Sequence, residues 1–563
     1  MVDRESLAAT SYCIYLVLLL VSFCLSFCLA TRCRSCTYFS EAGASLLVGF
    51  LGGGLLTLLV REDASDRFSE KEVQHSVVGF SSTVLFCVLL PPIIFDSGFR
   101  MRGAFFWANI DKIMVLAFVG TLLSSLVVGF LLVAVSGILP FAPDAPDGPS
   151  SISLPEALSF GALISATDPV TTLAIFEQLQ VDPHLFNVVF GESVLNDAVS
   201  IVLFHSFSKA IGAEEKNVLV SICGMTMDFV VIFVGSAIIG ASLGCLSALL
   251  FKHVDLPGHT AAHGPKLELA VFLVFCYAPF LLADGAGLSG IVAILFTGIT
   301  MKRYTFNNLS PDARETVQTI VSLMASCAET LVFIDLGTSA WESLRADIRL
   351  VAYVFLCCLL GRAVNVYTAG LILNATQPSY PRRPFETNDM RMVWFAGLRG
   401  AIAFALSTQF KGPHRHSTMA LAMWVVLISV WFLGGATAPM LSWLRIRRCE
   451  PEQLKQLALT LEPAVKRLTI VRWDQKYLSP WLLRMASPPS SPSRGDTEAQ
   501  DQNAGSDAAR AVRLKTTLTT LTPSYTSCEL QDIAHSQLPD TGREGAPHAS
   551  PLLTAREVGD EAE

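Results

Sequence analysis

The stretch FNVVFGESVLNDAVSIVLFH, residues 186–205, places two acidic side chains inside a long apolar run. About 20 residues of helix span the roughly 30 Å of a bilayer core, because a helix pairs all of its own backbone groups. An ionisable side chain inside that core costs about 2.5–3.5 kcal/mol on insertion scales, so it needs a partner or a task. The stretch therefore predicts a membrane-spanning helix in which Glu192 and Asp197 have such roles.

The rest of the chain repeats this apolar pattern. Of 563 residues, 52% are hydrophobic and only 16% are charged, which favours the bilayer as solvent. Apolar runs predict an all-α polytopic membrane protein with about 13 transmembrane helices. The expected helices are 11–31, 43–60, 76–96, 112–138, 155–180, 185–210, 224–251, 267–283, 287–301, 315–339, 348–373, 391–410 and 417–444.

Basic residues orient these helices, because Lys and Arg gather in short cytoplasmic loops. The loop 139–154 has no basic residue, so we place it outside the cytoplasm and the carboxyl terminus inside. We expect three parts: a transmembrane domain at 1–446, a juxtamembrane amphipathic region at 447–486 and a disordered cytoplasmic tail at 487–563. The first apolar run has no clear cleavage signal, so we expect it to be retained as a helix.

The polar residues of the opening stretch form one helical face. Ser193, Asp197 and Ser200 are spaced three and four apart, and Asn196 lies on the adjoining stripe with Glu192. A hard cation such as Na⁺ prefers several oxygen ligands, which one carboxylate with hydroxyl, amide and carbonyl oxygens supplies. The pattern predicts a site where a proton and a cation compete for Asp197.

Two other apolar runs are interrupted. In FGALISATDPVTTLAIF, 160–176, Pro169 disfavours helix at Asp168, beside the polar Thr167. A simple proline kink is the alternative to a broken helix whose free backbone groups bind an ion. In WFAGLRGAIAFAL, 394–406, glycines bracket Arg399, and this run is the candidate counterpart. Such paired interruptions mark binding sites in secondary transporters.

Arg362 lies too deep in its run to reach water and needs an anion. We expect Glu192 to pair with it, and Glu329 and Asp335 are the alternatives. The sequence contains no phosphate-binding GxxxxGK[ST] run and no HExxH, and its basic residues form no nucleic-acid face. We therefore expect no enzyme, no cofactor, no nucleic-acid partner and no metal beyond a transported ion. A channel or a non-transporting membrane sensor is the alternative function.

Several motifs together carry a resemblance to a known family. They are LLPPIIFDSGF (89–99), FGALISATDPVTTLAIF (160–176), VDPHLFNVVFGESVLNDAVSIVLF (181–204), AETLVFIDLG (328–337) and WFAGLRGAIAFAL (394–406). From about Ala44 to Leu444 the chain resembles the eukaryotic sodium/proton exchangers, a family of monovalent cation:proton antiporters. The segment WDQKYLSPWLL, 473–483, and details of 181–204 are most similar to the endomembrane branch.

This resemblance implies an inverted-repeat fold of thirteen helices, with two broken crossover helices, that forms homodimers. It also implies electroneutral exchange of Na⁺, or of K⁺, for H⁺ in an endomembrane (Golgi, endosome or vacuole) or in the plasma membrane, serving pH and cation balance. By resemblance, the residues with roles are Asp197 and Asn196 for ion exchange, Ser193, Thr167 and Asp168 near the cation, Glu192 and Arg362 as a salt bridge, and Pro169 and Arg399 at the crossovers. Asp335 departs from the family, which usually has an aromatic or apolar residue there.

Overall fold

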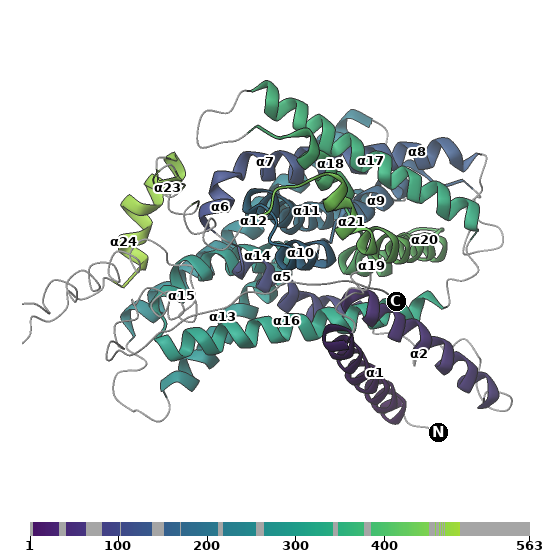
Figure 1. Cartoon of the computed structure of the whole chain (residues 1–563), viewed down its shortest axis with the longest axis horizontal. Coiled ribbons are helices and arrows are strands. Elements are labelled where there is room, and N and C mark those ends of the chain that lie inside the picture. Colours follow the sequence, from purple (N-terminus) through teal and green to yellow (C-terminus); the bar gives the residue numbers. More distant parts are fainter. Residues whose placement is uncertain are drawn as a thin grey trace, which may run out of the picture. The chain divides into compact units, whose positions relative to one another are not determined.

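The fold is built almost wholly of helices, as the apolar runs predict (Figure 1). The computed structural model describes residues 4–32, 41–63, 82–101, 103–137, 151–168, 170–211, 218–254, 264–341, 347–376, 384–449 and 468–484, with isolated positions between 457 and 466. Within these ranges, extended pairing is limited to one antiparallel bridge between Val181 and Arg448. The expected all-α class is confirmed for this part of the chain.

The helices coincide with the predicted runs. In chain order, the longer ones are α1 (Arg4–Arg32), α2 (Glu41–Asp63), α5 (Leu90–Phe99), α8 (Thr121–Ser136), α9 (Leu154–Ser165), α10 (Val170–Gln178), α11 (Pro183–Lys209), α12 (Val218–His253), α13 (Gly264–Gly285), α14 (Gly290–Thr300), α16 (Pro311–Ala340), α17 (Ile348–Ala375), α18 (Thr387–Phe395), α19 (Ala401–Thr408) and α20 (Arg415–Ile428).

Shorter helical segments extend or join them. They are α4 (Ser82–Val84), η1 (Leu85–Leu89), α6 (Gly103–Ala108), α7 (Ile110–Met114), η2 (Val115–Gly120), η3 (Met301–Thr305), α15 (Phe306–Asn308), η5 (Ser429–Gly434), α21 (Thr437–Trp443), α23 (Thr469–Trp473), η6 (Asp474–Leu478) and α24 (Ser479–Leu482).

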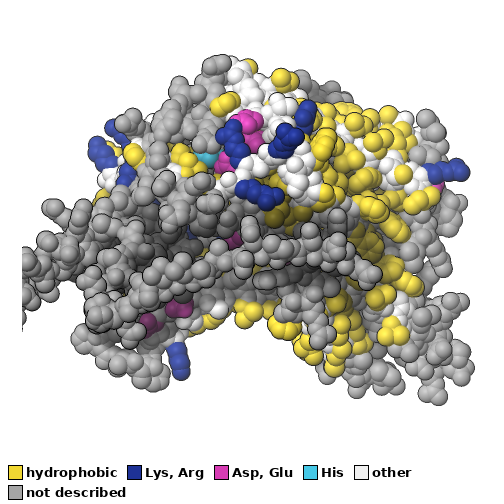
Figure 2. All heavy atoms as spheres, viewed as in Figure 1, with side chains coloured by type: hydrophobic (Ala, Val, Ile, Leu, Met, Phe, Trp, Pro, Cys, Tyr) yellow, Lys and Arg dark blue, Asp and Glu magenta, His cyan; other side chains and the backbone are white. Residues whose placement is uncertain are grey.

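Eight helices in the described ranges are long and apolar enough to cross a membrane. They differ in how much of their surface other helices cover. The apolar window of α11 is 89% buried, whereas that of α12 is only 22% buried. Apolar side chains also cover a broad part of the surface in Figure 2. Exposed apolar surface of this extent fits contact with lipid, so the chain is an integral membrane protein; the count of about 13 crossings stays a prediction.

The best-covered helix, α11, is enclosed by α9, by the continuous run α7–η2–α8 and by α12. Both interrupted runs are broken in the middle. The first is helical as α9 and α10 but not at Ala166–Asp168, and the second is helical as α18 and α19 but not at Gly397–Gly400. Pro169 itself lies outside the described residues. The breaks are therefore more than kinks, because each divides its run into two separate helices.

A second group of helices contains α1, α2, α5 and α16. Helix α16 packs closely along α2, and α1 packs on both. The hydroxyl of Tyr15 on α1 donates to Oδ1 of Asp335 on α16 at 2.8 Å, and Ser22 of α1 bonds Ser45 of α2 at 2.8 Å. Asp335, which departs from the family pattern, thus joins two helices within the membrane region.

After the last membrane helix the chain contacts the helix bundle at three places, and in the middle one Leu461 and Val465 pack against α6. The backbone near its start pairs with the α10–α11 turn: Asp182 N donates to Arg447 O at 3.0 Å and Cys449 N to Gln180 O at 2.8 Å. Farther on, α23, η6 and α24 pack against α12 and η3. Most of 450–467, within the amphipathic region expected at 447–486, lies outside the described residues, as does all of the tail expected at 487–563, so those two predictions stay untested.

Candidate ion-binding site

Helix α11 supplies the central side chains of the candidate site. Its N-cap, Asp182, accepts a hydrogen bond from His184 N at 2.9 Å, and Pro183 occupies the first turn, which together start the helix. Glu192, Asn196 and Asp197 are all buried, with at most 8% of their surface exposed. The sequence thus carries charged and polar groups into the best-covered part of the fold.

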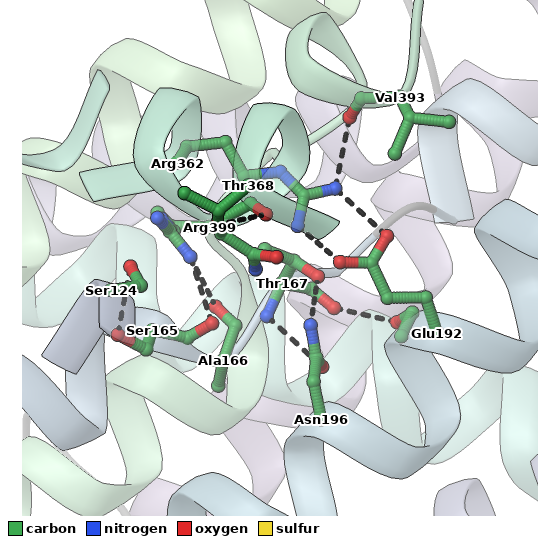
Figure 3. Close-up of polar contacts among 12 residues, drawn as sticks. Ser124, Ser165, Ala166, Thr167, Glu192, Asn196, Arg362, Thr368, Val393 and Arg399 are labelled. Atoms are coloured by element: carbon green, nitrogen blue, oxygen red, sulfur yellow. Dashed lines mark hydrogen bonds and ion pairs between the residues drawn. The ribbon is translucent and has the colours of Figure 1, made fainter. Parts of the chain in front are cut away.

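The break between α9 and α10 lies directly against α11. The hydroxyl of Ser193 donates to the carbonyl oxygen of Thr167 at 2.6 Å. The amide of Asn196 donates to the hydroxyl oxygen of Thr167 at 2.5 Å (Figure 3). Thr167 is therefore fixed by two side chains one helical turn apart. Ser193 and Asn196 hold the unwound strand in place, in addition to any contact they make with an ion.

The break between α18 and α19 places the positively charged side chain of Arg399 against the break between α9 and α10. Arg399 Nη1 donates to the carbonyl oxygens of Ser165 at 2.9 Å and Ala166 at 3.3 Å, where α9 ends (Figure 3). A helix C-terminus carries partial negative charge and free carbonyls, so the guanidinium satisfies both. The backbone of Arg399 is held in turn by Ser429, whose hydroxyl lies 3.1 Å from its N and 3.1 Å from its O.

Asp168 joins the two breaks from the other side. Its backbone N donates to Leu398 O at 2.9 Å, so the two unwound strands are hydrogen-bonded to each other. Its carboxylate accepts from the backbone N of Val170 at 3.1 Å and from that of Ala401. These are the first residues of α10 and α19. One carboxylate therefore caps two helix N-termini, where negative charge is favoured.

This double cap requires glycine at position 400. A Cβ built on Gly400 would lie 2.0 Å from Oδ2 of Asp168, closer than real contacts allow. Its backbone, at φ −139°, would itself accept other residues. Glycine is needed here for close approach rather than for an unusual backbone conformation.

Arg362 on α17 binds Glu192 on α11 through two hydrogen bonds. Nη2 lies 2.9 Å from Oε2, Nη1 also contacts Oε1, and Nη2 reaches the carbonyl oxygen of Val393 at 2.9 Å. The side chains are 4% and 1% exposed. Of the alternatives, Asp335 bonds Tyr15 instead, and Glu329 has no hydrogen bond at Oε1 among the described residues.

Asp197 differs from the paired Glu192 and from the capping Asp168. Its Oδ1 is buried and has no hydrogen-bond partner among the described residues, and the same holds for the hydroxyl of Ser200 one turn later. The charges that act on Asp197 are those of Asp168 and Arg399. Glu192 is neutralised by Arg362 and Asp168 caps two helices. Asp197 is thus the carboxylate of the site left open to bind a proton or a cation.

The ligand set fits a lightly held monovalent cation. On the face of α11 that carries the open carboxylate of Asp197 lie the hydroxyls of Ser193 and Ser200, and such oxygen groups suit a hard ion of low charge. Within the ranges that the structure describes, no three His, Cys, Asp or Glu residues converge as metal ligands.

Two contributors were not found from the sequence. The hydroxyl of Ser429 is hydrogen-bonded to the backbone of Arg399. The carbonyl oxygen of Val393 accepts from the same Arg362 nitrogen that binds Glu192. Ser429 stands alone in an apolar run, where a serine commonly bonds its own helix, and a backbone carbonyl has no sequence signal. The interruption at Arg399 was the available sign that something must brace this segment.

The chain is similar to known proteins over most of its length. Residues 18–443 match the family model described as "Sodium/hydrogen exchanger, transmembrane". Human sodium/hydrogen exchanger 9 is 34% identical over 431 residues, covering 73% of this chain but only 65% of its own length. Human sodium/hydrogen exchanger 8 is 35% identical, covering 82% and 74%, and sodium/hydrogen exchanger 5 of Arabidopsis thaliana is 35% identical, covering 79% and 82%.

The fold has a solved counterpart. A sodium/proton antiporter from Methanocaldococcus jannaschii superposes with a TM-score of 0.56 at 17% identity, covering 77% of this chain and 99% of the antiporter. At that identity the likeness concerns the fold alone. The family model covers most of the chain, including both broken helices and α11. The chain therefore belongs to the sodium/hydrogen exchanger family.

Proposed function

We propose that this protein is a secondary antiporter that exchanges Na⁺ for H⁺ across a membrane, with K⁺ as the alternative cation. The observation that carries the proposal is the open carboxylate of Asp197 in a site whose other acids are occupied. A single group that holds either a proton or a cation couples their opposite movements. Ion gradients then drive exchange by alternating access, without a cofactor or an enzymatic step.

The surrounding residues have separate tasks in this proposal. Ser193, Asn196 and Thr167 place oxygens beside Asp197, and Asp168 and Arg399 hold the two broken helices together. The Glu192–Arg362 pair fixes α11 against α17. We further propose that the protein works as a homodimer with its carboxyl terminus in the cytoplasm, in an endomembrane or the plasma membrane, where it adjusts pH and cation balance.

Replacement of the exchanging carboxylate tests the proposal directly. In vesicles containing purified Asp197→Asn, sodium should no longer dissipate an imposed proton gradient, because the amide cannot release a proton. Glu315→Gln removes an exposed acid from α16 and should retain the wild-type rate. A dye that reports internal pH provides the measurement. Sodium-dependent proton flux through Asp197→Asn would refute the assignment, and flux without coupling in the wild type would favour a channel.

Electroneutral exchange is a separate prediction. With Asn196 neutral and Asp197 the open carboxylate of α11, one proton should leave for each cation that binds. The exchange rate should then be unchanged when the vesicle potential is clamped at opposite signs with potassium and valinomycin, provided that sodium is the cation tested. Asn196→Asp adds a second carboxylate and should make the rate depend on voltage. A voltage-dependent wild type would contradict the role given to Asn196.

A further inference from the structure

The helical run Thr469–Leu482, formed by α23, η6 and α24, has two neighbouring stripes of side chains with different surroundings. Asp474, Leu478 and Leu482 are spaced four apart and face the protein. Trp473, Tyr477 and Trp481, one position earlier in each turn, are exposed. This second stripe and the basic residues beside it are called here the aromatic face.

The first stripe is firmly anchored. Asp474 accepts from Arg303 at 2.8 Å and from the hydroxyl of Tyr304. Leu482 is fully buried in a cluster with Ala248 and Tyr304. Its carbonyl oxygen accepts from the side chain of Asn308 at 2.8 Å.

The end of the run is held as well. Lys252, at the last turn of α12, donates to the carbonyl oxygens of Pro480 at 3.0 Å and Trp481 at 2.8 Å. Free carbonyls at a helix C-terminus favour such a cation. The run is therefore fixed in orientation, and the exposure of the aromatic face is a property of the fold.

The aromatic face leaves large rings uncovered. Trp473, Tyr477 and Trp481 are 55%, 55% and 59% exposed. The rings of Trp473 and Tyr477 lie 5.9 Å apart, and Lys476 Nζ lies 5.1 Å from the Tyr477 ring. The other exposed charge nearby is Arg472, while the acid of the run, Asp474, is paired on the protein side. The aromatic face thus carries two cations and no open anion.

Its position continues a lipid-facing surface. Val234, Ile238 and Leu246 of α12 share one helical stripe and are 47%, 60% and 52% exposed, as expected against lipid tails. Lys252, six residues after Leu246 near the end of the same helix, binds the run. In Figure 1, α23 and α24 lie at one end of the bundle and run across the direction of α13 and α16. The run therefore lies across the direction of α13 and α16, beside the end of α12 that carries Lys252.

We propose that the aromatic face lies in the headgroup layer of the membrane and binds anionic lipid. Trp and Tyr prefer this layer because an apolar ring and a polar group are satisfied together, and Lys and Arg attract anionic headgroups. A second copy of the chain is the competing occupant. In a two-fold contact the same surface meets itself, so Arg472 and Lys476 would face their own copies with no acid between them.

Tryptophan quenching by lipid tests the proposal on the full chain. Wild type and Trp473→Phe/Trp481→Phe are reconstituted in phosphatidylcholine vesicles with and without phosphatidylserine. The difference in tryptophan fluorescence between the wild type and Trp473→Phe/Trp481→Phe reports on Trp473 and Trp481. In the wild type this part of the fluorescence should be quenched by lipid brominated near the headgroup, and the quenching should be stronger with phosphatidylserine. Arg472→Gln/Lys476→Gln should remove at least half of that added quenching, whereas Arg349→Gln, an exposed cation on α17, should not change it.

Two outcomes would overturn the proposal. Quenching of the same emission by aqueous iodide, without quenching by brominated lipid, would place the aromatic face in water. Protection from both quenchers, with dissociation of a dimer in the double variant, would make it a contact between copies. If Trp473→Phe/Trp481→Phe does not fold, Arg472→Gln/Lys476→Gln still tests lipid binding, because it keeps every aromatic ring. Its quenching by brominated lipid is then compared with that of the wild type. None of these readouts depends on transport, so they stand apart from the exchange proposal.

Discussion

Asp197 and Glu192 show how two acids five residues apart on one helix come to differ. Glu192 faces α17, where Arg362 and the carbonyl of Val393 complete its surroundings. Asp197 faces the unwound strands and keeps an unpaired oxygen. The charge near each acid, more than its depth in the protein, separates a structural acid from an exchanging one.

The Arg362–Glu192 pair leads to a stability prediction. Removing one member of a buried pair leaves the other charge uncompensated, at a cost of about 3–5 kcal/mol, whereas removing both is far less harmful. Arg362→Ala should therefore lower the thermal unfolding midpoint of purified protein more than Arg362→Ala/Glu192→Ala does. Elution from a size-exclusion column after heating provides the measurement. If single and double variants lose the same stability, the two residues do not act as a pair.

Some residue-level features could be predicted from sequence and others could not. Glu192, Asp197 and Arg362 are visible because a charge inside an apolar run is costly in lipid. Asp335 is visible for the same reason, but its partner Tyr15 is 320 residues away on α1 and has no local signal. Residue type reveals that a partner is needed, and only the three-dimensional packing reveals which one.

At the scale of elements, Asp168 is the residue through which α10 and α19 are joined. Both helices begin at its carboxylate, and the strands before them share the hydrogen bond from Asp168 N to Leu398 O. The proline and glycine signals predicted two interruptions, and they did not predict this shared cap, which depends on how the two unwound strands cross. We expect α10 and α19 to move together whenever the site changes its exposure.

Gly400→Ala tests the shared cap. The added methyl group would lie 2.0 Å from Oδ2 of Asp168, so the carboxylate must move away from one or both helix ends. We expect the sodium-dependent proton flux to fall at least tenfold, because a small displacement near a binding site has large effects on rate. Gly137→Ala is the matched control, since nothing lies within 4 Å of a Cβ at that position. Equal flux in both variants would show that the close approach is unimportant.

At the scale of the whole molecule, the chain after the last membrane helix contacts several parts of the bundle, including α6 through Leu461 and Val465. Its start pairs with the α10–α11 turn, beside the site helix, and its helical run α23–η6–α24 is anchored on α12 and η3. Apolar patterning predicted the membrane part well, since lipid selects for long apolar helices. It did not predict this attachment, which rests on a few polar contacts such as Arg303 with Asp474.

Asp474→Asn should weaken the attachment of the run α23–η6–α24 to η3. A partly exposed ion pair contributes about 1 kcal/mol or less, so the detached population should rise up to about fivefold. Limited trypsin digestion of purified protein, followed by mass spectrometry, should then cut faster at Arg472 and Lys476, while cleavage elsewhere is unchanged. Glu386→Gln, which loses an exposed pair with Arg447, serves as control. An unchanged cleavage rate would show that the ion pair does not hold the run.

The pairing with the α10–α11 turn and the anchoring of the run α23–η6–α24 limit how far the chain between them can extend. Between Cys449 and Thr469 it can extend to about 70 Å at most, at 3.3–3.6 Å per residue. Contacts of Leu461 with Phe105 and of Val465 with Ala108 take up part of that slack. A mechanical load on residues beyond Arg484 would fall first on Asn308 and Lys252, and it would reach the site helix only after those contacts gave way. We therefore expect a displacement at Arg484 to break the contacts with Asn308 and Lys252 before it disturbs α11.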